Sequence, residues 1–191
     1  MDIAFVDTET TGLDPNRAEV IEFAAIRKNA DGTETRFHTL ICPQRIDDAD
    51  VKALEINGYA KAPERWDTAP TMDQVGNQIA DFLRGAVICG HNISFDEAML
   101  NANLHRAGVK RRVPYHKVDT VTLAHEHLVP LGLKRLSLDF IRAFLGWSKK
   151  DAHTAMKDAE DVQRLYNLTI RMGWFRRLSL RFSLWRSARN A

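Results

Sequence analysis

Residues 2–12 read DIAFVDTETTG, a short apolar run that ends in an acidic turn. The apolar part is typical of a β-strand. Side chains two residues apart on a strand point to the same face of the sheet, so Asp7 and Glu9 face the same way at the strand end. Such a pair of carboxylates can hold a divalent cation. A solvated strand end with turn residues around Gly12 is the alternative interpretation of a lone acidic pair.

The next forty residues continue this first strand into a predicted antiparallel sheet. Residues 19–26 alternate between apolar and polar in a way that suits a second strand. Asp31-Gly32 is a strong hairpin signal, and residues 35–41 form the returning strand. The chain is therefore expected to open with three antiparallel strands.

Helices and further strands follow, each predicted from a cap, an apolar spacing and a glycine stop. They are a helix capped by Thr71 and stopped by Gly85, an apolar strand at 86–89, a helix capped by Ser94 and stopped by Gly108, a short strand around Val118 that leads through Asp119 and Thr120 into a helix, a helix over 137–145, and a helix from near His153 or Thr154 through Leu168. Strands followed by alternating helices and strands predict an α/β fold with a mixed sheet covered by helices. No repeat or linker divides residues 1–170, so we predict one domain there.

Two further acids and a histidine follow predicted strands or begin predicted helices. Asp96 lies in the first turn of the helix after the apolar strand, where complementing the helix dipole is its alternative role. His153 and Asp158 lie on either side of a helix start, and both can border one cleft if His153 belongs to the preceding loop. The remaining six histidines are interpreted as surface residues.

The composition fits one compact domain without covalent cross-links, since 45% of the 191 residues are hydrophobic. Cys42 and Cys89 lie in what are interpreted as apolar strands and are expected to be small core residues of a reduced, cytoplasmic protein. The N-terminus lacks a basic region followed by a long apolar run, so we expect no secretion signal, and no segment approaches the length of a membrane span.

Residues 171–191 form a basic aromatic stretch, which we call the basic tail. It contains six of the 27 lysines and arginines and no acid, so residues 1–170 carry about −4 by formal count. Its apolar residues Trp174, Leu178, Phe182 and Trp185 have helical spacing, although alternation around residue 180 also permits a strand. Contact with nucleic acid, with an anionic membrane surface or with a protein partner fits this pattern, as does an ordinary helix folded back on the domain.

The three acidic segments, in this order and spacing, resemble the three motifs of the DEDDh branch of the DnaQ-like 3'-to-5' exonucleases, a family that includes the proofreading subunit of bacterial DNA polymerase III. The resemblance covers about residues 3–170 and rests on Asp7, Glu9, Asp96, His153 and Asp158. A tyrosine branch of the same superfamily has tyrosine where this chain has Thr154, so the histidine branch is preferred. The resemblance implies a ribonuclease H-like fold, a five-stranded mixed sheet with helices on both sides.

The resemblance also implies a two-metal-ion mechanism with Mg²⁺ or Mn²⁺, because all the ligands are oxygens. Asp7 would bridge both ions, Glu9 and Asp158 would complete the site of the ion that activates water, and Asp96 would serve the second ion. His153 would accept the proton of the attacking water. The product would be a nucleoside 5'-monophosphate released from a 3' end.

Four residues match positions that hold the terminal nucleotide in related enzymes: Thr8, Thr10, Leu13 and Asn92. A core position is the alternative for Leu13, and structural packing is the alternative for the neighbouring His91 and Phe95. Asp119 and Asp161 are left out of the metal site, because a helix cap and an exposed helix face explain them better.

The expected activity is removal of nucleotides from single-stranded or frayed 3' ends of DNA, by a freestanding enzyme or one that assists a polymerase. An RNA-trimming enzyme of the same fold is the nearest alternative, because nothing in the motifs reports the 2'-hydroxyl. An adaptor that recruits a partner through the basic tail is the alternative from another class. The intact set of five residues argues against the adaptor.

Overall fold

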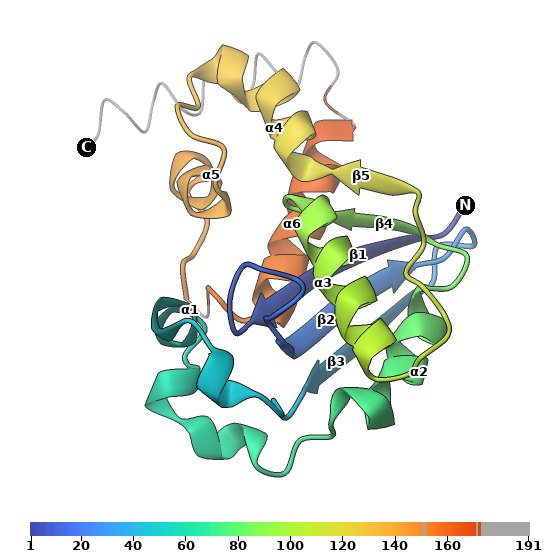
Figure 1. The fold of residues 1–191 in the computed structure, drawn as a ribbon. Coiled ribbons are helices and arrows are strands. Elements are labelled where there is room, and N and C mark those ends of the chain that lie inside the picture. The colour runs from blue at the N-terminus through green and yellow to red at the C-terminus, as the bar shows by residue number, and fades with distance from the viewer. Residues whose placement is uncertain (151, 171, 173–191) are drawn as a thin grey trace.

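The computed structural model describes residues 1–150, 152–170 and 172, and a mixed sheet lies at its centre (Figure 1). Its strands are β1 (Ile3–Thr10), β2 (Val20–Lys28), β3 (Glu34–Leu40), β4 (Val87–Gly90) and β5 (Lys117–Asp119). They lie in the order β3-β2-β1-β4-β5, in which β1 pairs antiparallel with β2 and parallel with β4. The predicted five-stranded mixed sheet is confirmed.

The hairpin between β2 and β3 forms at the predicted Asp31-Gly32 turn. Gly32 has a φ of +91°, a conformation that glycine adopts without the steric cost of a side chain. The backbone N–H of Asn29 donates to the Thr33 carbonyl at 2.9 Å and closes the turn. The local turn signal therefore sets the register in which β3 returns along β2.

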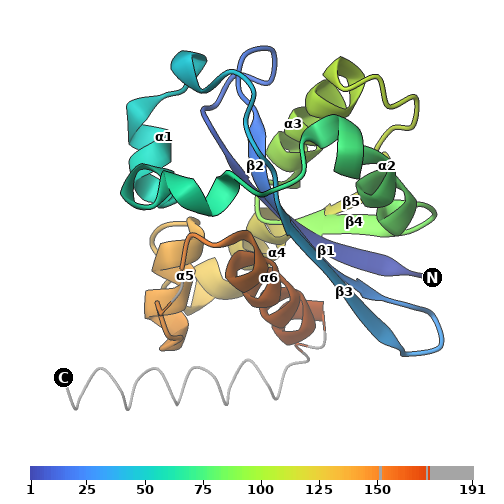
Figure 2. The same cartoon turned by 90° about the horizontal axis from the view of Figure 1, so that it is seen from below.

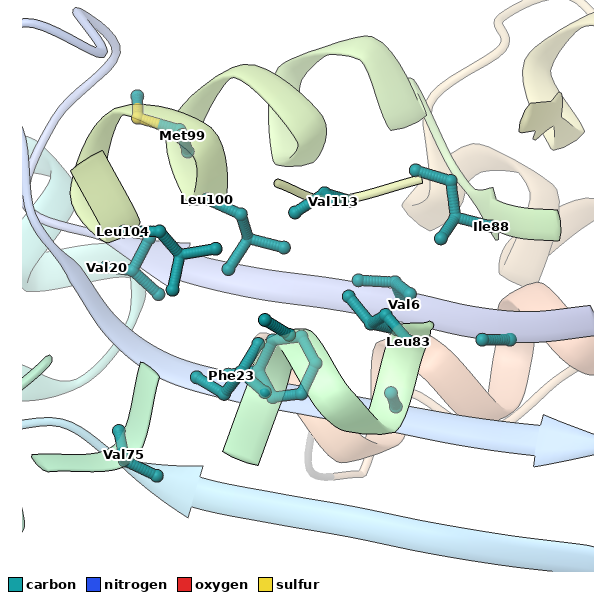
Figure 3. Packing of buried hydrophobic residues seen from close by; sticks show 14 of the residues in the cluster. Val6, Val20, Phe23, Val75, Leu83, Ile88, Met99, Leu100, Leu104 and Val113 are labelled. Atoms are coloured by element: carbon teal, nitrogen blue, oxygen red, sulfur yellow. The ribbon is translucent and has the colours of Figure 1, made fainter. Parts of the chain in front are cut away.

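Alternate residues of the central strand point to opposite faces of the sheet. Ala4 and Val6 belong to the apolar cluster under α2 (Met72–Leu83) and α3 (Ile93–Arg106), as Figure 3 shows for Val6. Phe5 belongs to the cluster under α6 (Ala155–Ile170) on the other face. Figure 2 shows these helices on opposite sides of the sheet. Helices on both faces were predicted, and this is confirmed.

Three more helices complete the layers: α1 (Val51–Ile56), α4 (Thr120–Leu128) and α5 (Leu138–Leu145). A separate apolar cluster joins α4, α5 and α6 through Leu128, Ile141 and Leu165. The predicted cap at Thr71 is confirmed, since Thr71 precedes α2 and its N–H donates to the Gln74 side chain at 3.0 Å.

The predicted cap of α3 is wrong by two residues. Asn92, not Ser94, is the N-cap, and it has a φ of 69°. The turn is so tight that a Cβ atom on Gly90 would lie 2.7 Å from Ile93 Cδ1. The chain therefore passes from β4 into the helix at once, before it reaches Ser94.

Residues 46–66 fold into α1 and three 3₁₀ turns that the sequence patterns did not predict. The turns are Ile46–Asp48, Tyr59–Lys61 and Pro63–Trp66. Asn57 Nδ2 donates to the Thr10 carbonyl at 3.0 Å, and Trp66 Nε1 donates to the Ile21 carbonyl at 2.7 Å. The remaining 3₁₀ turn, Val129–Leu131, follows α4. Contacts with the ends of β1 and β2 thus hold residues 46–66.

Cys42 and Cys89 are both free thiols. Cys89 is buried in β4 as predicted, whereas Cys42 lies beyond the end of β3 and is half-buried, so the core position expected for it is wrong. None of the helices in the described part of the chain has the length and apolar character that crossing a membrane requires. The basic tail lies outside the described residues, apart from the buried Met172.

Candidate active site

The pleat of β1 directs two carboxylates toward α6. Residues 5, 7 and 9 share one side of the strand, and Phe5 packs on that side against Ala155 and Ala159 of α6. Asp7 and Glu9 therefore point to the same layer, where Asp158 lies in the first turn of α6. One carboxylate oxygen from each of these three acids lies within 4.8 Å of the others.

Asp96 lies near this group but outside it. It occupies the first turn of α3, is 4% exposed, and accepts a hydrogen bond of 2.7 Å from Thr8 Oγ1. Thr8 is an even-numbered residue of β1, on the opposite side of the strand from Asp7 and Glu9. The structure thus brings three of the four predicted acids together and places the fourth across the end of the same strand.

The four carboxyl groups hold their protons more tightly than acids in water do. Burial, with the charges of neighbouring acids, raises the pKa of Asp7 well above its usual range and that of Glu9 to about 9. Burial raises the pKa of Asp96 to about 7 and raises the pKa of Asp158 as well. A divalent cation supplies the positive charge that lets such a cluster ionise. The oxygen-only group suits a hard cation.

Glu22 is a further buried acid at the site, which the sequence patterns missed. It lies directly opposite Glu9 in the β1–β2 register and is 4% exposed. Its Oε1 lies 2.8 Å from His38 Nε2 and accepts from the Ala155 N–H at 3.2 Å. Glu22 therefore holds the beginning of α6, two residues after His153. Its position next to apolar residues in the second strand was the available signal.

The position of Asp161 differs from the one predicted. The exposed helix face expected for it is wrong, because it is 1% exposed and pairs with Arg142, which is itself fully buried. Both residues occupy apolar-stripe positions: Arg142 follows Leu138 by four residues, and Asp161 precedes Leu165 by four. That helical spacing was the signal that could have revealed the pair.

His153 lies in the loop before α6, the position from which it can border one cleft with Asp158, and has a φ of 66°. Its N–H donates to Asp158 Oδ1 at 3.3 Å, so the backbone of His153 is tied to the acidic cluster. The side chain is 44% exposed, and its Nε2 lies 3.5 Å from Asp139 Oδ2. The imidazole is thus accessible to water beside the cluster.

The four residues predicted to hold a terminal nucleotide differ in their accessibility. Leu13 is 77% exposed, so the alternative core position is wrong for it, and Asn92 is exposed as well. The hydroxyl of Thr8 donates to Asp96, and that of Thr10 donates to the Gly12 carbonyl at 2.8 Å. Leu13 and Asn92 therefore present exposed side chains to a ligand, whereas Thr8 and Thr10 already use their hydroxyls.

His91 and Phe95 have structural contacts. The two ring nitrogens of His91 lie 3.0 Å from Thr120 Oγ1 and 2.6 Å from the Leu136 carbonyl, and Phe95 packs against the main core. His91 is half-buried, and these contacts fit the structural packing given as its alternative; burial also lowers its pKa. Asp119 caps α4, as predicted, through a hydrogen bond of 2.8 Å from the Val121 N–H.

Comparison with known proteins shows which family the chain resembles. A family model described as exonuclease (RNase_T) matches residues 4–166. The chain is 32% identical over 165 residues to the DNA polymerase III subunit epsilon of Treponema pallidum (strain Nichols), covering 86% of this chain and 74% of that relative. It is 30% identical over 181 residues to ribonuclease T of Marinobacter nauticus (strain ATCC 700491 / DSM 11845 / VT8), covering 84% and 78%. Larger relatives named DNA polymerase III PolC-type are covered over only 11–12% of their length.

Among solved structures, E. coli exonuclease I in complex with a dT13 oligonucleotide is similar, with a TM-score of 0.72 and 21% sequence identity. The match covers 87% of this chain and 40% of that chain. Identity at this level concerns the fold alone, and the fold is the ribonuclease H-like one that the motifs predicted.

Proposed function

Since the chain belongs to the exonuclease family whose model matches residues 4–166, we propose that it is a 3'-to-5' exonuclease that acts on DNA. Single-stranded or frayed 3' ends are the substrates, and nucleoside 5'-monophosphates are the products. The single observation that carries the proposal is the group formed by Asp7, Glu9 and Asp158, whose carboxylate oxygens lie within 4.8 Å of one another.

We propose that this group holds divalent metal ions, with Mg²⁺ or Mn²⁺ preferred because the ligands are carboxylate oxygens. Asp7, Glu9 and Asp158 would bind one ion, and Asp96 would serve a second ion together with Asp7. Two such ions, when bound, lower the pKa of water and neutralise charge on the reacting phosphate. The raised pKa values of all four acids support the need for that positive charge.

His153 is the proposed general base. This role is supported by the position of His153 in the loop next to Asp158 and by the 44% exposure of its side chain, from which it would accept a proton from water and pass it to solvent. Leu13 and Asn92 are the proposed contacts to the terminal nucleotide, with Thr8 and Thr10 contributing through their backbone. Leu13 would act as an apolar wedge against the last base.

RNA is the second candidate substrate. The relative named ribonuclease T covers 84% of this chain at 30% identity, and the acidic cluster has no group that distinguishes ribose from deoxyribose. The relative named DNA polymerase III subunit epsilon supports DNA, and it also supports a polymerase as a protein partner of this chain, with the basic tail as the proposed contact. We further propose a cytoplasmic location, which suits two free thiols.

The test is degradation of 5'-end-labelled single-stranded DNA, duplex DNA and RNA in Mg²⁺ and, separately, in EDTA. We expect a ladder that shortens from the 3' end of DNA in Mg²⁺ and no products in EDTA. Asp7→Ala and His153→Ala should lose most of this activity, and Asp47→Asn, at an exposed acid in a 3₁₀ turn, should keep it.

A second substrate with a phosphorothioate at its 3' end checks the direction, because a blocked 3' end should protect the whole strand. Equal degradation by wild type and Asp7→Ala would refute the mechanism. Faster degradation of RNA than DNA would favour the second candidate.

A further inference from the structure

Arg142 is a fully buried cation between α5 and α6, beside the acidic cluster. Its three guanidinium nitrogens donate to three different carboxylates. Nη2 reaches Asp158 Oδ1 at 2.6 Å, Nε reaches Asp161 Oδ2 at 2.8 Å, and Nη1 reaches Asp139 Oδ1 at 3.0 Å. One planar group thus fixes three acids relative to one another.

The two acids on α6 are three residues apart and share one face of the helix. Arg142 therefore holds α6 at two successive points, one of which is the proposed metal ligand Asp158. The third acid, Asp139, lies on α5 and is 3.5 Å from the imidazole of His153. The same guanidinium is consequently linked to the proposed metal site directly and to the proposed base through one side chain.

The hydrogen bonds at Asp158 leave one of its oxygens available. Among the described residues, the donors to Asp158 are Arg142 Nη2 and the N–H of His153, and both reach Oδ1. Oδ2 therefore keeps its lone pairs for a metal ion. A carboxylate held through one oxygen and free at the other has the arrangement of a preoriented ligand.

We propose that Arg142 is a positioning residue that orients Asp158 toward the metal ions and, through Asp139, orients His153. The inference rests on the proposed function and adds to it a residue that touches neither substrate nor metal. It does not require Arg142 to move or to change its charge.

A second physical role makes the opposite prediction. A cation 2.6 Å from Asp158 also repels a divalent ion, so if Arg142 only balanced the negative charge of the acids, its removal would tighten metal binding. The positioning role predicts weaker binding on removal, because Asp158 would then sample orientations that do not favour the ion. The sign of the change separates the two roles.

Two variants test the positioning role of Arg142 while limiting the damage to folding. Arg142→Lys keeps a positive charge but has a single ammonium in place of the planar fork. The double variant Arg142→Met with Asp161→Leu replaces the buried pair by apolar residues, so Asp161 is not left buried without Arg142. It removes one charge of each sign, so the net charge beside the cluster stays the same and a weaker Kd reports the orientation of Asp158. Lys157, which also contacts Asp161 at 2.6 Å, is partly exposed and keeps access to water. Arg36→Met is the matched control, because Arg36 pairs with Glu160 of the same helix at an exposed position.

The measurement is a Mn²⁺ titration of each protein, with free Mn²⁺ followed by electron paramagnetic resonance. We expect the Kd to rise about 10–100-fold in the double variant, as for other residues that orient metal ligands, and to rise in the lysine variant too. At saturating Mn²⁺ kcat on an oligonucleotide should fall, with KM unchanged, because Arg142 does not contact the substrate. Arg36→Met should match wild type in both assays, and circular dichroism melting checks the fold of each variant.

A folded double variant with the wild-type Kd and kcat, or with a tighter Kd, overturns the positioning role. If the double variant does not fold, the lysine variant decides, and wild-type values in it overturn the inference. Wild-type protein that binds no Mn²⁺ and hydrolyses no oligonucleotide would instead refute the proposed function on which the inference rests.

Discussion

Replacing Asp96 by asparagine should stabilise the metal-free protein at alkaline pH. Asp96 is 4% exposed, and burial raises its pKa from 3.8 to about 7, so its ionised form destabilises the fold. Asparagine has nearly the same shape and keeps an oxygen that can accept the hydrogen bond of 2.7 Å from Thr8 Oγ1. The substitution therefore removes the charge with little change in packing.

The size of the effect follows from the two pKa values of Asp96. The folded protein binds the proton more tightly than the unfolded chain, so the destabilisation is absent below pH 3.8, grows as the pH rises, and is complete above about pH 7. The interval from 3.8 to about 7 corresponds to about 4 kcal/mol at 1.36 kcal/mol per pH unit. The free energy of unfolding of Asp96→Asn should exceed that of wild type by up to about 4 kcal/mol at pH 8. At pH 5 the excess should be only about 2 kcal/mol, because pH 5 lies only slightly above 3.8.

The assay is urea unfolding of wild type and Asp96→Asn in EDTA at pH 5 and pH 8, with exposed Asp47→Asn as the control. Asp47→Asn should change the free energy of unfolding by less than about 0.5 kcal/mol at both pH values. Adding Mn²⁺ should shrink the advantage of Asp96→Asn, because the ion stabilises the ionised wild-type site. A gain at pH 8 no larger than that at pH 5, or a loss at both, would refute the reasoning.

Three further substitutions test other parts of the structure. Leu13→Ala should raise KM for single-stranded DNA several-fold in steady-state kinetics while changing the free energy of unfolding by less than about 0.5 kcal/mol, since Leu13 is 77% exposed; an unchanged KM contradicts the wedge. Gly90→Ala should lower the free energy of unfolding in urea by about 1–3 kcal/mol, because the new Cβ would lie 2.7 Å from Ile93 Cδ1 and 3.2 Å from the backbone oxygen of Val6; wild-type stability would show that the Ile93 side chain or α3 can shift. Trp66→Phe should lower it by about 1–3 kcal/mol in the same assay, because the Ile21 carbonyl loses the indole donor at 2.7 Å, and an unchanged value would mean that water replaces that donor.

The regular elements could be predicted because their signals are local. A turn glycine, a helix cap and an apolar period each act within about one turn of helix or one hairpin. Residues 46–66 carry no such period, and hydrogen bonds to the distant ends of β1 and β2 hold their short turns. Interactions of that kind join residues about 45 positions apart, so a local pattern does not contain them.

The site residues also fall into two groups: those predicted from local patterns and those whose burial depends on distant residues. Asp7, Glu9 and Asp158 follow from strand alternation and motif spacing, and the structure brings them within 4.8 Å. The Arg142–Asp161 pair escaped prediction because a single charged residue on an apolar stripe normally marks the exposed edge of a helix. Two cations balance the buried charge of Asp161: Lys157 of the same helix at 2.6 Å and Arg142, 19 residues away on another helix, at 2.8 Å.

In the described part of the chain, unusual backbone angles and an unfavourable pair of acids lie close to the acidic cluster. Asn92 and His153 are its non-glycine residues with positive φ, and they begin or precede the two helices that carry Asp96 and Asp158. Two acids, Glu9 and Glu22, lie directly opposite each other on the neighbouring strands β1 and β2, a pairing that destabilises a sheet when both are ionised. A fold selected only as a platform for a partner gains nothing from these costs, and neutral residues would serve it better. A group of acids gathered around a possible cation site gives these costs a use, which favours the exonuclease over the adaptor.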